Sequence, residues 1–231
     1  MKTLPLLLIL SLIGCSKELL TNTGTFNDSR DKHEYKWVQI STQTWMAENL
    51  AYLPLVSVGQ FTTEWETIPK YFVYDYQGTS VSAAMASSNY RIYGVLYNWA
   101  AAKVACPNGW HLPTNEEWNI MEIFLGMDPI YADSLSLRSS GDVAKKLKTK
   151  TGWAKNGGGD NSSGFSALPA GGRWYNGGDF LSLGSVAEFW SASEYGDWYA
   201  MARYLHYQYD GMFWAGDFRS NGNSVRCLKD N

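Results

Sequence analysis

The sequence predicts an α+β domain, in which two main helices pack on small antiparallel sheets with long loops. Helix signals are confined to the middle of the chain and strand signals lie before and after them, which excludes an alternating βαβ fold. Of the 231 residues, 45% are apolar and 15% are aromatic, so the chain can bury a core and wholesale disorder is excluded. The length allows one large domain or two small ones.

Three segments carry helix signals. Residues 96–105 are rich in alanine and place apolar side chains at helical spacing. Thr114 and Glu117 form a capping box, which predicts that a second helix starts there and covers residues 115–125. Residues 142–148 predict a third, short helix.

Short runs rich in aromatic and apolar residues, bounded by Gly, Asn and Asp, predict strands on both sides of the helices. Asp210 and Gly211 predict a tight hairpin turn, in which the pair supplies a positive φ. Residues 52–89 are expected to form a long irregular loop with short strands, and the Gly-rich residues 155–164 a flexible loop. The predicted strands are residues 35–40, 44–49, 165–169, 188–193, 198–207 and 224–229.

The N-terminus carries an export signal. Lys2 precedes an apolar run over residues 4–13, which is shorter than the roughly 20 residues of a transmembrane span. The run closes on Leu-Ile-Gly-Cys, which resembles the bacterial lipoprotein box. That resemblance implies that Cys15 carries lipid and that residues 1–14 are removed. The alternative is an ordinary signal peptide that contains a cysteine.

This N-terminus divides the chain into three predicted parts: a signal peptide (1–14), a tether (15–34) and a single domain (35–231). Several acyl chains on one residue anchor a soluble domain stably, so the bilayer is one expected partner. Because Ser16, and not Asp, follows the cysteine, we expect an exported lipoprotein of the outer membrane, at its periplasmic face or the cell surface.

The remaining cysteines, Cys106 and Cys227, form an even pair. In an oxidising compartment such a pair predicts a disulfide, which would close a loop of about 120 residues and stabilise the fold by roughly 4–5 kcal/mol at most. The alternative is two buried free thiols, because the sequence has no CxxC motif and no Cys/His cluster.

Charge and motifs narrow the functional classes. Subtracting 22 acidic from 19 basic residues gives a net charge of −3. This charge does not favour nucleic-acid binding, which calls for a basic surface. The sequence has no GxSxG and no HExxH motif, so we expect neither a catalytic set nor a cofactor. His111 is interpreted as a structural hydrogen-bonding residue, and Glu116 and Glu117 as capping residues. Asp160 and Asn161 could ligate calcium through oxygen.

The aromatic residues fall into two groups. The tryptophans inside predicted helices and strands are expected to be buried in the hydrophobic core. They are Trp45, Trp99, Trp110, Trp118 and Trp190. Those beside Gly-, Asn- and Asp-rich loops of the C-terminal half predict a surface for a glycan or a protein, with the filling of a loop-rich interior as the alternative. The candidate binding residues are Arg173, Trp174, Tyr175, Trp198, Tyr199, Arg203 and Trp214, with Phe213 and Arg219 as further members, whereas Arg226 is interpreted as a buried ion-pair partner.

Several motifs together resemble one known family. They are residues 43–50, 94–102, 105–118, 164–173, 189–193 and 224–230. In this order they resemble the Fibrobacter succinogenes major paralogous domain, over a range from about residue 26 to the C-terminus. The biochemical role of that family is unassigned, so the resemblance implies architecture and not activity.

A wider resemblance concerns the fold. The order of helix, cysteine, Gly-Trp-His-Leu-Pro-Thr and second helix is similar to the opening of C-type-lectin-like domains. In that fold a cysteine of the last strand bonds to the end of the first helix, which implies the pairing of Cys106 with Cys227. The Leu-Pro-Thr motif also resembles formylglycine-generating enzymes, but the cysteines that their copper chemistry needs are missing here. The calcium motif of the lectins is missing too.

The sequence therefore predicts a lipid-anchored, non-enzymatic recognition domain with a C-type-lectin-like fold. Its partner would be a glycan or a surface protein, bound on the aromatic loops. The alternatives are a diverged formylglycine-generating-type oxidoreductase and a structural, adhesin-like surface protein.

Overall fold

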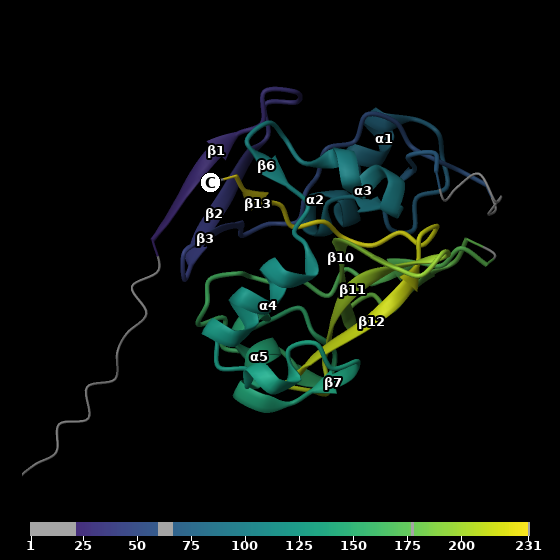
Figure 1. Cartoon of the computed structure of the whole chain (residues 1–231). Coiled ribbons are helices and arrows are strands. Elements are labelled where there is room, and N and C mark those ends of the chain that lie inside the picture. The colour runs from purple at the N-terminus through teal and green to yellow at the C-terminus, as the bar shows by residue number, and fades with distance from the viewer. Residues whose placement is uncertain (1–21, 60–66, 177, 231) are drawn as a thin grey trace, which may run out of the picture.

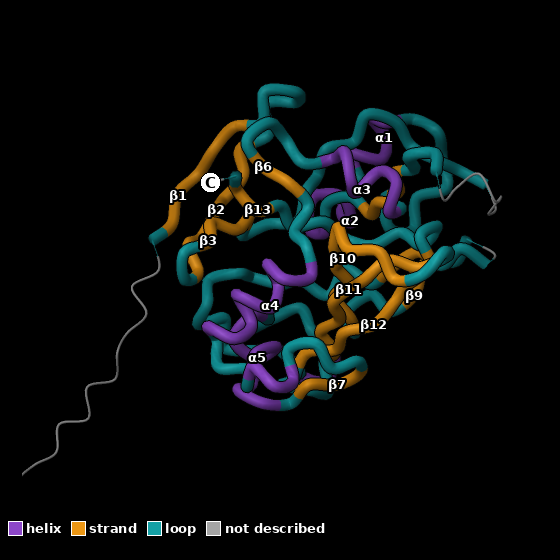
Figure 2. Tube along the Cα trace, in the orientation of Figure 1, coloured by secondary structure: helices purple, strands orange, loops and turns teal. Residues whose placement is uncertain are grey.

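The described part of the chain combines short helices with several small antiparallel sheets, so the predicted α+β class is confirmed. The structure is a computed structural model, which describes residues 22–59, 67–176 and 178–230. Loops occupy much of the trace between the elements (Figure 2). Within the described ranges, no helix has the length and apolar character needed to cross a bilayer. Cys15 and the predicted signal peptide lie outside these ranges.

A five-stranded sheet joins segments from both ends and from the middle of the chain, in the order β1-β2-β3-β13-β6. Strands β1, β2 and β3 follow one another and pair antiparallel. Strand β13 lies between β3 and β6, because Leu228 pairs with Trp45 on one side and with His111 on the other. The strands are β1 (Thr23–Asn27), β2 (Glu34–Ile40), β3 (Gln43–Met46), β6 (Trp110–His111) and β13 (Leu228–Lys229).

The prediction that residues 15–34 form a tether is wrong for its described part, because residues 23–27 form strand β1 of the sheet. Residues 15–21 lie outside the described ranges. The ring of Phe26 in this strand stacks on Trp110 with centroids 4.4 Å apart and on Tyr35 at 5.5 Å. Packing of the Phe26 ring thus holds an otherwise polar segment on the sheet. The composition of the segment does not reveal that it forms a strand.

A four-stranded antiparallel sheet occupies the C-terminal half, in the order β10-β11-β12-β7. The predicted hairpin is confirmed, since it connects β11 to β12. The reason that glycine is needed in this turn differs from the predicted one. Gly211 has no positive φ, but a Cβ there would lie 2.5 Å from the carbonyl oxygen of Arg138. The strands are β7 (Ser136–Arg138), β10 (Val186–Tyr195), β11 (Tyr199–His206) and β12 (Met212–Phe218).

The helices form two groups, α1 to α3 on one side and α4 with α5 on the other (Figure 1). Helix α3 (Trp99–Ala105) starts later than predicted, because strand β5 (Leu96–Tyr97) precedes it and Asn98 caps its first turn. Helix α4 begins with the predicted capping box of Thr114 and Glu117. The other helices are α1 (Val81–Ala86), α2 (Ser88–Tyr93), α4 (Asn115–Phe124) and α5 (Val143–Leu147), with 3-10 turns at Pro129–Tyr131, Ser140–Asp142 and Ala154–Asn156.

Three further predictions need correction. Residues 52–89 contain a short strand, β4 (Tyr71–Phe72), as predicted, but also helix α1 and the start of α2, which were not predicted. Residues 165–169 form no strand and make a single bridge to Lys148. Of the strand predicted for residues 224–229, only the last two residues form a strand, which is β13. Two small pairs complete the topology: β4 with β5, and β8 (Gly172–Arg173) with β9 (Phe180–Leu181).

The tryptophans predicted to form the core are all buried: Trp45, Trp99, Trp110, Trp118 and Trp190. They belong to two main apolar clusters, one around α3 and the other between α4, α5 and the second sheet. The indole N–H groups of Trp99 and Trp190 donate to the carbonyl oxygens of Ser191 and Tyr97 at 2.9 and 2.7 Å. Burial of these rings therefore leaves those donors satisfied.

The C-terminal segment, defined as residues 220–228, is buried along its whole length. It runs between the two helix groups towards β13 (Figure 1). The predicted disulfide joins its Cys227 to Cys106, which caps the end of α3, with the two Cα atoms 5.8 Å apart. The free-thiol alternative is therefore wrong.

The Gly-rich residues 155–164 are packed tightly and are not the flexible loop that was predicted. A Cβ at Gly157 would lie 2.0 Å from the carbonyl oxygen of Tyr207, and one at Gly159 would lie 1.9 Å from that of Lys145. Glycine is required here because two backbones approach each other closely.

We expect Gly159→Ala to lower the free energy of unfolding by about 3 kcal/mol, because the new Cβ would overlap the Lys145 carbonyl and push the two segments apart. Urea unfolding followed by tryptophan fluorescence measures the change. Lys150→Ala, at an exposed position nearby, is the control and should stay within about 0.5 kcal/mol of wild type. Equal stability of the two variants would contradict this, because it would show that the backbone around residue 159 can accommodate a Cβ without loss of stability.

Candidate functional site

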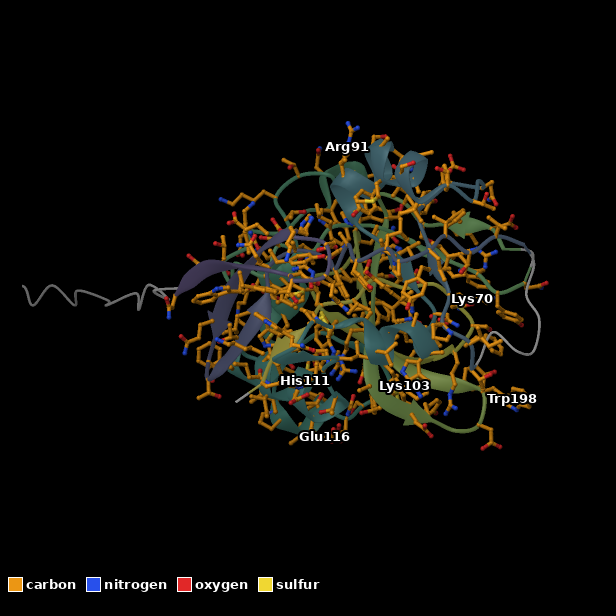
Figure 3. The ribbon with its side chains drawn as sticks, turned by 90° about the horizontal axis from the view of Figure 1, so that it is seen from above. Lys70, Arg91, Lys103, His111, Glu116 and Trp198 are labelled. Carbon is orange, nitrogen blue, oxygen red and sulfur yellow. A yellow bond between two sulfur atoms is a disulfide. The ribbon has the colours of Figure 1, made fainter. Side chains whose placement is uncertain are left out.

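Two of the tryptophans predicted to bind ligand, Trp174 and Trp198, are exposed to 50% and 56%. Trp198 lies in the turn between β10 and β11, and Figure 3 shows it at the periphery of the molecule. Trp174 follows strand β8 directly. Tryptophan is highly buried on average, so two exposed indoles mark this end of the second sheet as a candidate site.

Tyr175 and Tyr199 directly follow these two tryptophans in the chain, and their rings are half-buried. The ring of Tyr175 contacts Phe218 with centroids 4.3 Å apart, and Phe218 contacts Tyr199 at 4.5 Å. We call the set of Trp174, Tyr175, Trp198, Tyr199 and Phe218 the ring platform. It brings together a loop, a hairpin and the end of β12.

Phe218 is the member of the ring platform that the sequence did not identify. It lies opposite Tyr199 in the register of β11 and β12. Since β12 was not among the predicted strands, the cross-strand pairing that places this ring could not be inferred. The run of aromatic and small residues over 212–218 after a recognised hairpin turn is the signal that could have revealed it.

Arg219 fixes the hairpin that carries Trp198. Its Nε donates to the carbonyl oxygen of Tyr199 at 3.1 Å and its Nη2 to that of Gly196 at 3.0 Å. The guanidinium also pairs with Glu194 at 3.2 Å. Arg219 therefore holds the turn in place from within, as a positioning residue.

Asn221 connects the other side of the ring platform to β12. Its Oδ1 accepts from the backbone N–H of Tyr175 at 2.8 Å, and its Nδ2 donates to Asp217 at 2.6 Å. Asp217 also accepts from the side chain of Asn223 at 2.7 Å and from the N–H of Phe218 at 3.0 Å. One carboxylate thus organises both the loop of Tyr175 and the end of β12.

Arg203 is fully buried, so its prediction as a ligand-binding residue is wrong. Trp214 is also buried, but it lines a groove of the same sheet, so its role stays a prediction. They face each other across β11 and β12, on the side of the sheet that packs against α4. The Nε of Arg203 donates to Glu122 at 2.7 Å, and its Nη2 donates to Asn119 at 2.9 Å. The reason is strand alternation, which turns this side of the sheet inward.

Two other arginines are also buried. The guanidinium of Arg173 lies 4.3 Å from the ring of Phe72 and donates to the carbonyl oxygen of Gly59, and burial lowers its pKa to about 10. It is therefore not part of the exposed surface. Arg226 is buried as predicted, but among the described residues it forms no ion pair, and its Nε donates to the Asn49 side chain at 2.8 Å.

His111 makes the structural hydrogen bonds that were predicted. Its Nδ1 lies 2.6 Å from Asp230 and its Nε2 lies 2.9 Å from Glu117, the residue that closes the capping box of α4. Partial burial lowers the pKa of His111, but the two carboxylates outweigh this and raise the pKa above its ordinary value. His111 thus links β6, α4 and the C-terminus.

The side chains of the predicted calcium ligands, Asp160 and Asn161, form hydrogen bonds with residues close in the sequence. Asp160 accepts from the N–H of Ser162 at 2.9 Å, and Asn161 exchanges two hydrogen bonds with Ser166. Across residues 22–59, 67–176 and 178–230, no group of three His, Cys, Asp or Glu side chains is placed to hold a metal ion. Calcium stays a prediction from sequence.

The motifs and the platform lie within one family match, since residues 38–229 match the Fibrobacter succinogenes major domain. The chain belongs to that family. The resemblance of its motifs is thereby confirmed. No curated protein and no solved structure matches this Fibrobacter succinogenes major domain.

Next to its ring platform, this Fibrobacter succinogenes major domain buries two carboxyl groups. Burial raises the pKa of Glu188 to about 8, and the negative charge of Asp217 adds to the effect. Burial also raises the pKa of Asp217, against the bonds from Asn223 and Asn221. A Cβ on Gly172 would meet Glu188 Oε2 at 2.3 Å and Asn223 Oδ1 at 3.3 Å, and that Oδ1 has no donor among the described residues. A protonated Glu188 can supply one.

A groove of about 540 Å³ lies along the same sheet. Its lining includes Tyr195 from the β10–β11 hairpin, together with Glu188, Tyr204 and Phe213. The Fibrobacter succinogenes major domain therefore has a concave surface on this sheet, although none of the five ring-platform residues lines it. Such concave sites are typical of small-ligand binding.

We expect the free energy of unfolding of this domain to fall as pH rises from about 5 to 8, because a carboxyl with a raised pKa stabilises the folded state in its protonated form and loses this contribution once it ionises. Glu188→Gln cannot ionise, so its stability should fall less over this range. Denaturant titrations at several pH values measure both slopes, with Glu116→Gln as an exposed control. Parallel slopes for all three proteins would contradict the assignment.

We expect Arg203→Ala to lower the free energy of unfolding by about 3–5 kcal/mol, because it leaves Glu122 buried with only one of its two arginine partners. Thermal unfolding by circular dichroism measures this. Arg91→Ala, at an exposed arginine, is the control and should change stability by less than about 0.5 kcal/mol. A stable Arg203→Ala protein would show that the buried network contributes little.

Proposed function

We propose that this domain is a non-enzymatic recognition module that binds a glycan through the ring platform. The observation that carries the proposal is the pair of exposed indoles of Trp174 and Trp198. The residues that follow them, Tyr175 and Tyr199, both contact the half-buried ring of Phe218. Flat aromatic faces suit the apolar C–H face of a sugar ring, while polar side chains such as Asp197 can bind its hydroxyl groups.

Two observations favour a glycan over a protein partner. The sheet that carries Tyr199 and Phe218 also has a groove of about 540 Å³, whereas a flat protein interface needs no concave site. The rings also alternate with the charged groups of Glu194 and Arg219, so they do not form one large apolar patch.

The oxidoreductase alternative is less well supported. Formylglycine-generating chemistry, by resemblance, depends on free cysteines in the C-terminal part. The cysteine of this part, Cys227, is fully buried and bonded to Cys106. No thiolate is therefore present there to act as a nucleophile or a ligand.

We further propose that the domain is an outer-membrane lipoprotein, anchored through Cys15. The lipoprotein-like box of the sequence supports this. The segment between Cys15 and β1 can span at most about 25 Å, so the domain would stay close to the bilayer surface.

We also infer a C-type-lectin-like architecture. The disulfide from the end of α3 to the residue before β13 supports it, as does the short connection through β6 from α3 to α4. In such an arrangement the long loops are free to carry a binding surface.

Trp174→Ala and Trp198→Ala should each lower glycan affinity by about tenfold or more, because each removes an exposed ring from the ring platform. A glycan array identifies the ligand, and calorimetry with that ligand measures the loss. Tyr131→Ala, at a ring that is exposed to 48% and lies outside the ring platform, is the matched control. The proposal fails if the two tryptophan variants bind as tightly as the control.

A further inference from the structure

A second concave region lies away from the ring platform. It has a volume of about 890 Å³ and is bordered by β1, β2, residues 47–51, the end of α2 and residues 164–168. We call it the β1–α2 cleft. No residue of the ring platform lines it.

One wall of the β1–α2 cleft carries a fixed aromatic ring. Trp37 lies over Gly24 of the neighbouring strand, where a Cβ would be only 2.5 Å from the indole. Its Nε1 donates to the carbonyl oxygen of Thr25 at 3.3 Å. Since Trp37 is only partly buried, a preorganised ring borders the cleft.

A positive charge lies behind the floor of the β1–α2 cleft. The guanidinium of Arg226 donates to the Oδ1 of Asn49 and to the carbonyl oxygen of Ser166, both at 2.8 Å, and both of these residues line the cleft. All its hydrogen bonds in the described chain go to uncharged acceptors, and the Glu48 carboxylate acts on it without forming an ion pair. In such a low-dielectric setting the charge biases the cleft towards anions.

The rim of the β1–α2 cleft adds a free cation. Glu48 is neutralised by Lys36, with their charged atoms 3.1 Å apart. Arg91 makes no ion pair with any described residue, and Figure 3 shows it at the outer surface of α2. Glu34 and His33 also line the cleft, and Glu34 is the one lining carboxylate that no described cation pairs with.

We propose that the β1–α2 cleft is a second binding site, which takes a saccharide that carries a carboxylate, such as a uronic acid. The sugar ring would stack on Trp37, and its carboxylate would pair with Arg91 over the positive floor. Arginine is suited to this role, because its planar fork binds a carboxylate through two parallel hydrogen bonds. This site stands on its own residues and does not depend on the ring platform.

Calorimetry of the purified chain with a short oligogalacturonate, and with a neutral oligogalactose of the same length, tests the proposal. We expect the acidic chain to bind, more weakly at high salt, and the neutral chain to bind at least tenfold more weakly. Arg91→Gln should weaken binding of the acidic chain about three- to tenfold, whereas Glu34→Gln, which removes a like charge, should strengthen it about twofold.

Two controls separate the β1–α2 cleft from the ring platform and from loss of folding. Tyr131→Ala, at an exposed ring outside both surfaces, should leave binding of the oligogalacturonate unchanged. A loss of that binding in Trp198→Ala would instead place the acidic chain on the ring platform and overturn the proposal. Trp37→Phe keeps a ring over Gly24 and should retain part of the affinity, with the melting temperature as a check on folding. The proposal is overturned if the oligogalacturonate does not bind, if the neutral chain binds equally well, or if the two charge variants bind like wild type.

Discussion

The C-terminal segment is the constraint on which the other parts of this structure depend. Its backbone pairs in turn with Arg173, Tyr97, Glu188, Leu50 and Met46, which belong to four different segments of the chain. Each of these bonds is lost if the segment shifts by one residue, so its position must be fixed. The disulfide at residue 227 fixes it, because it ties the segment to the end of α3 and closes a separation of 121 residues.

Buried cations replace much of the hydrogen bonding that larger sheets would provide. Long loops leave carbonyl oxygens without strand or helix partners, and a buried carbonyl needs a donor. Arg226 donates to the carbonyl oxygens of Met46, Phe165 and Ser166, and the ammonium of Lys148 donates to those of Gly157 and Tyr209. A loop-rich interior thereby becomes fully packed, at a desolvation cost that these bonds offset.

The same segment also supports both proposed binding surfaces. Asn221, near its start, holds the loop of Tyr175 in the ring platform. Arg226, near its end, lies behind the floor of the β1–α2 cleft. The two surfaces are therefore attached to one rigid, buried strip of chain, while the parts that would contact ligand are loops and edge residues. A chain with two such sites could hold a long glycan at two points, which increases the effective concentration at the second site.

The sequence by itself determined the features that depend on neighbours along the chain. The capping box of α4, the hairpin after β11 and the core tryptophans are of this kind, because each follows from local geometry or from apolar character. The disulfide is a long-range feature, but the even number of remaining cysteines predicted it. Only the tertiary structure decided which of the aromatic and arginine candidates face solvent. Trp198 and Trp214 occur in similar contexts, yet a turn exposes one and strand alternation buries the other. The Gly-rich residues 155–164 and strand β1 are further cases. Close backbone packing orders the glycine run, and the stacking of Phe26 on Trp110 holds β1 on the sheet, although the composition of both segments indicates flexibility.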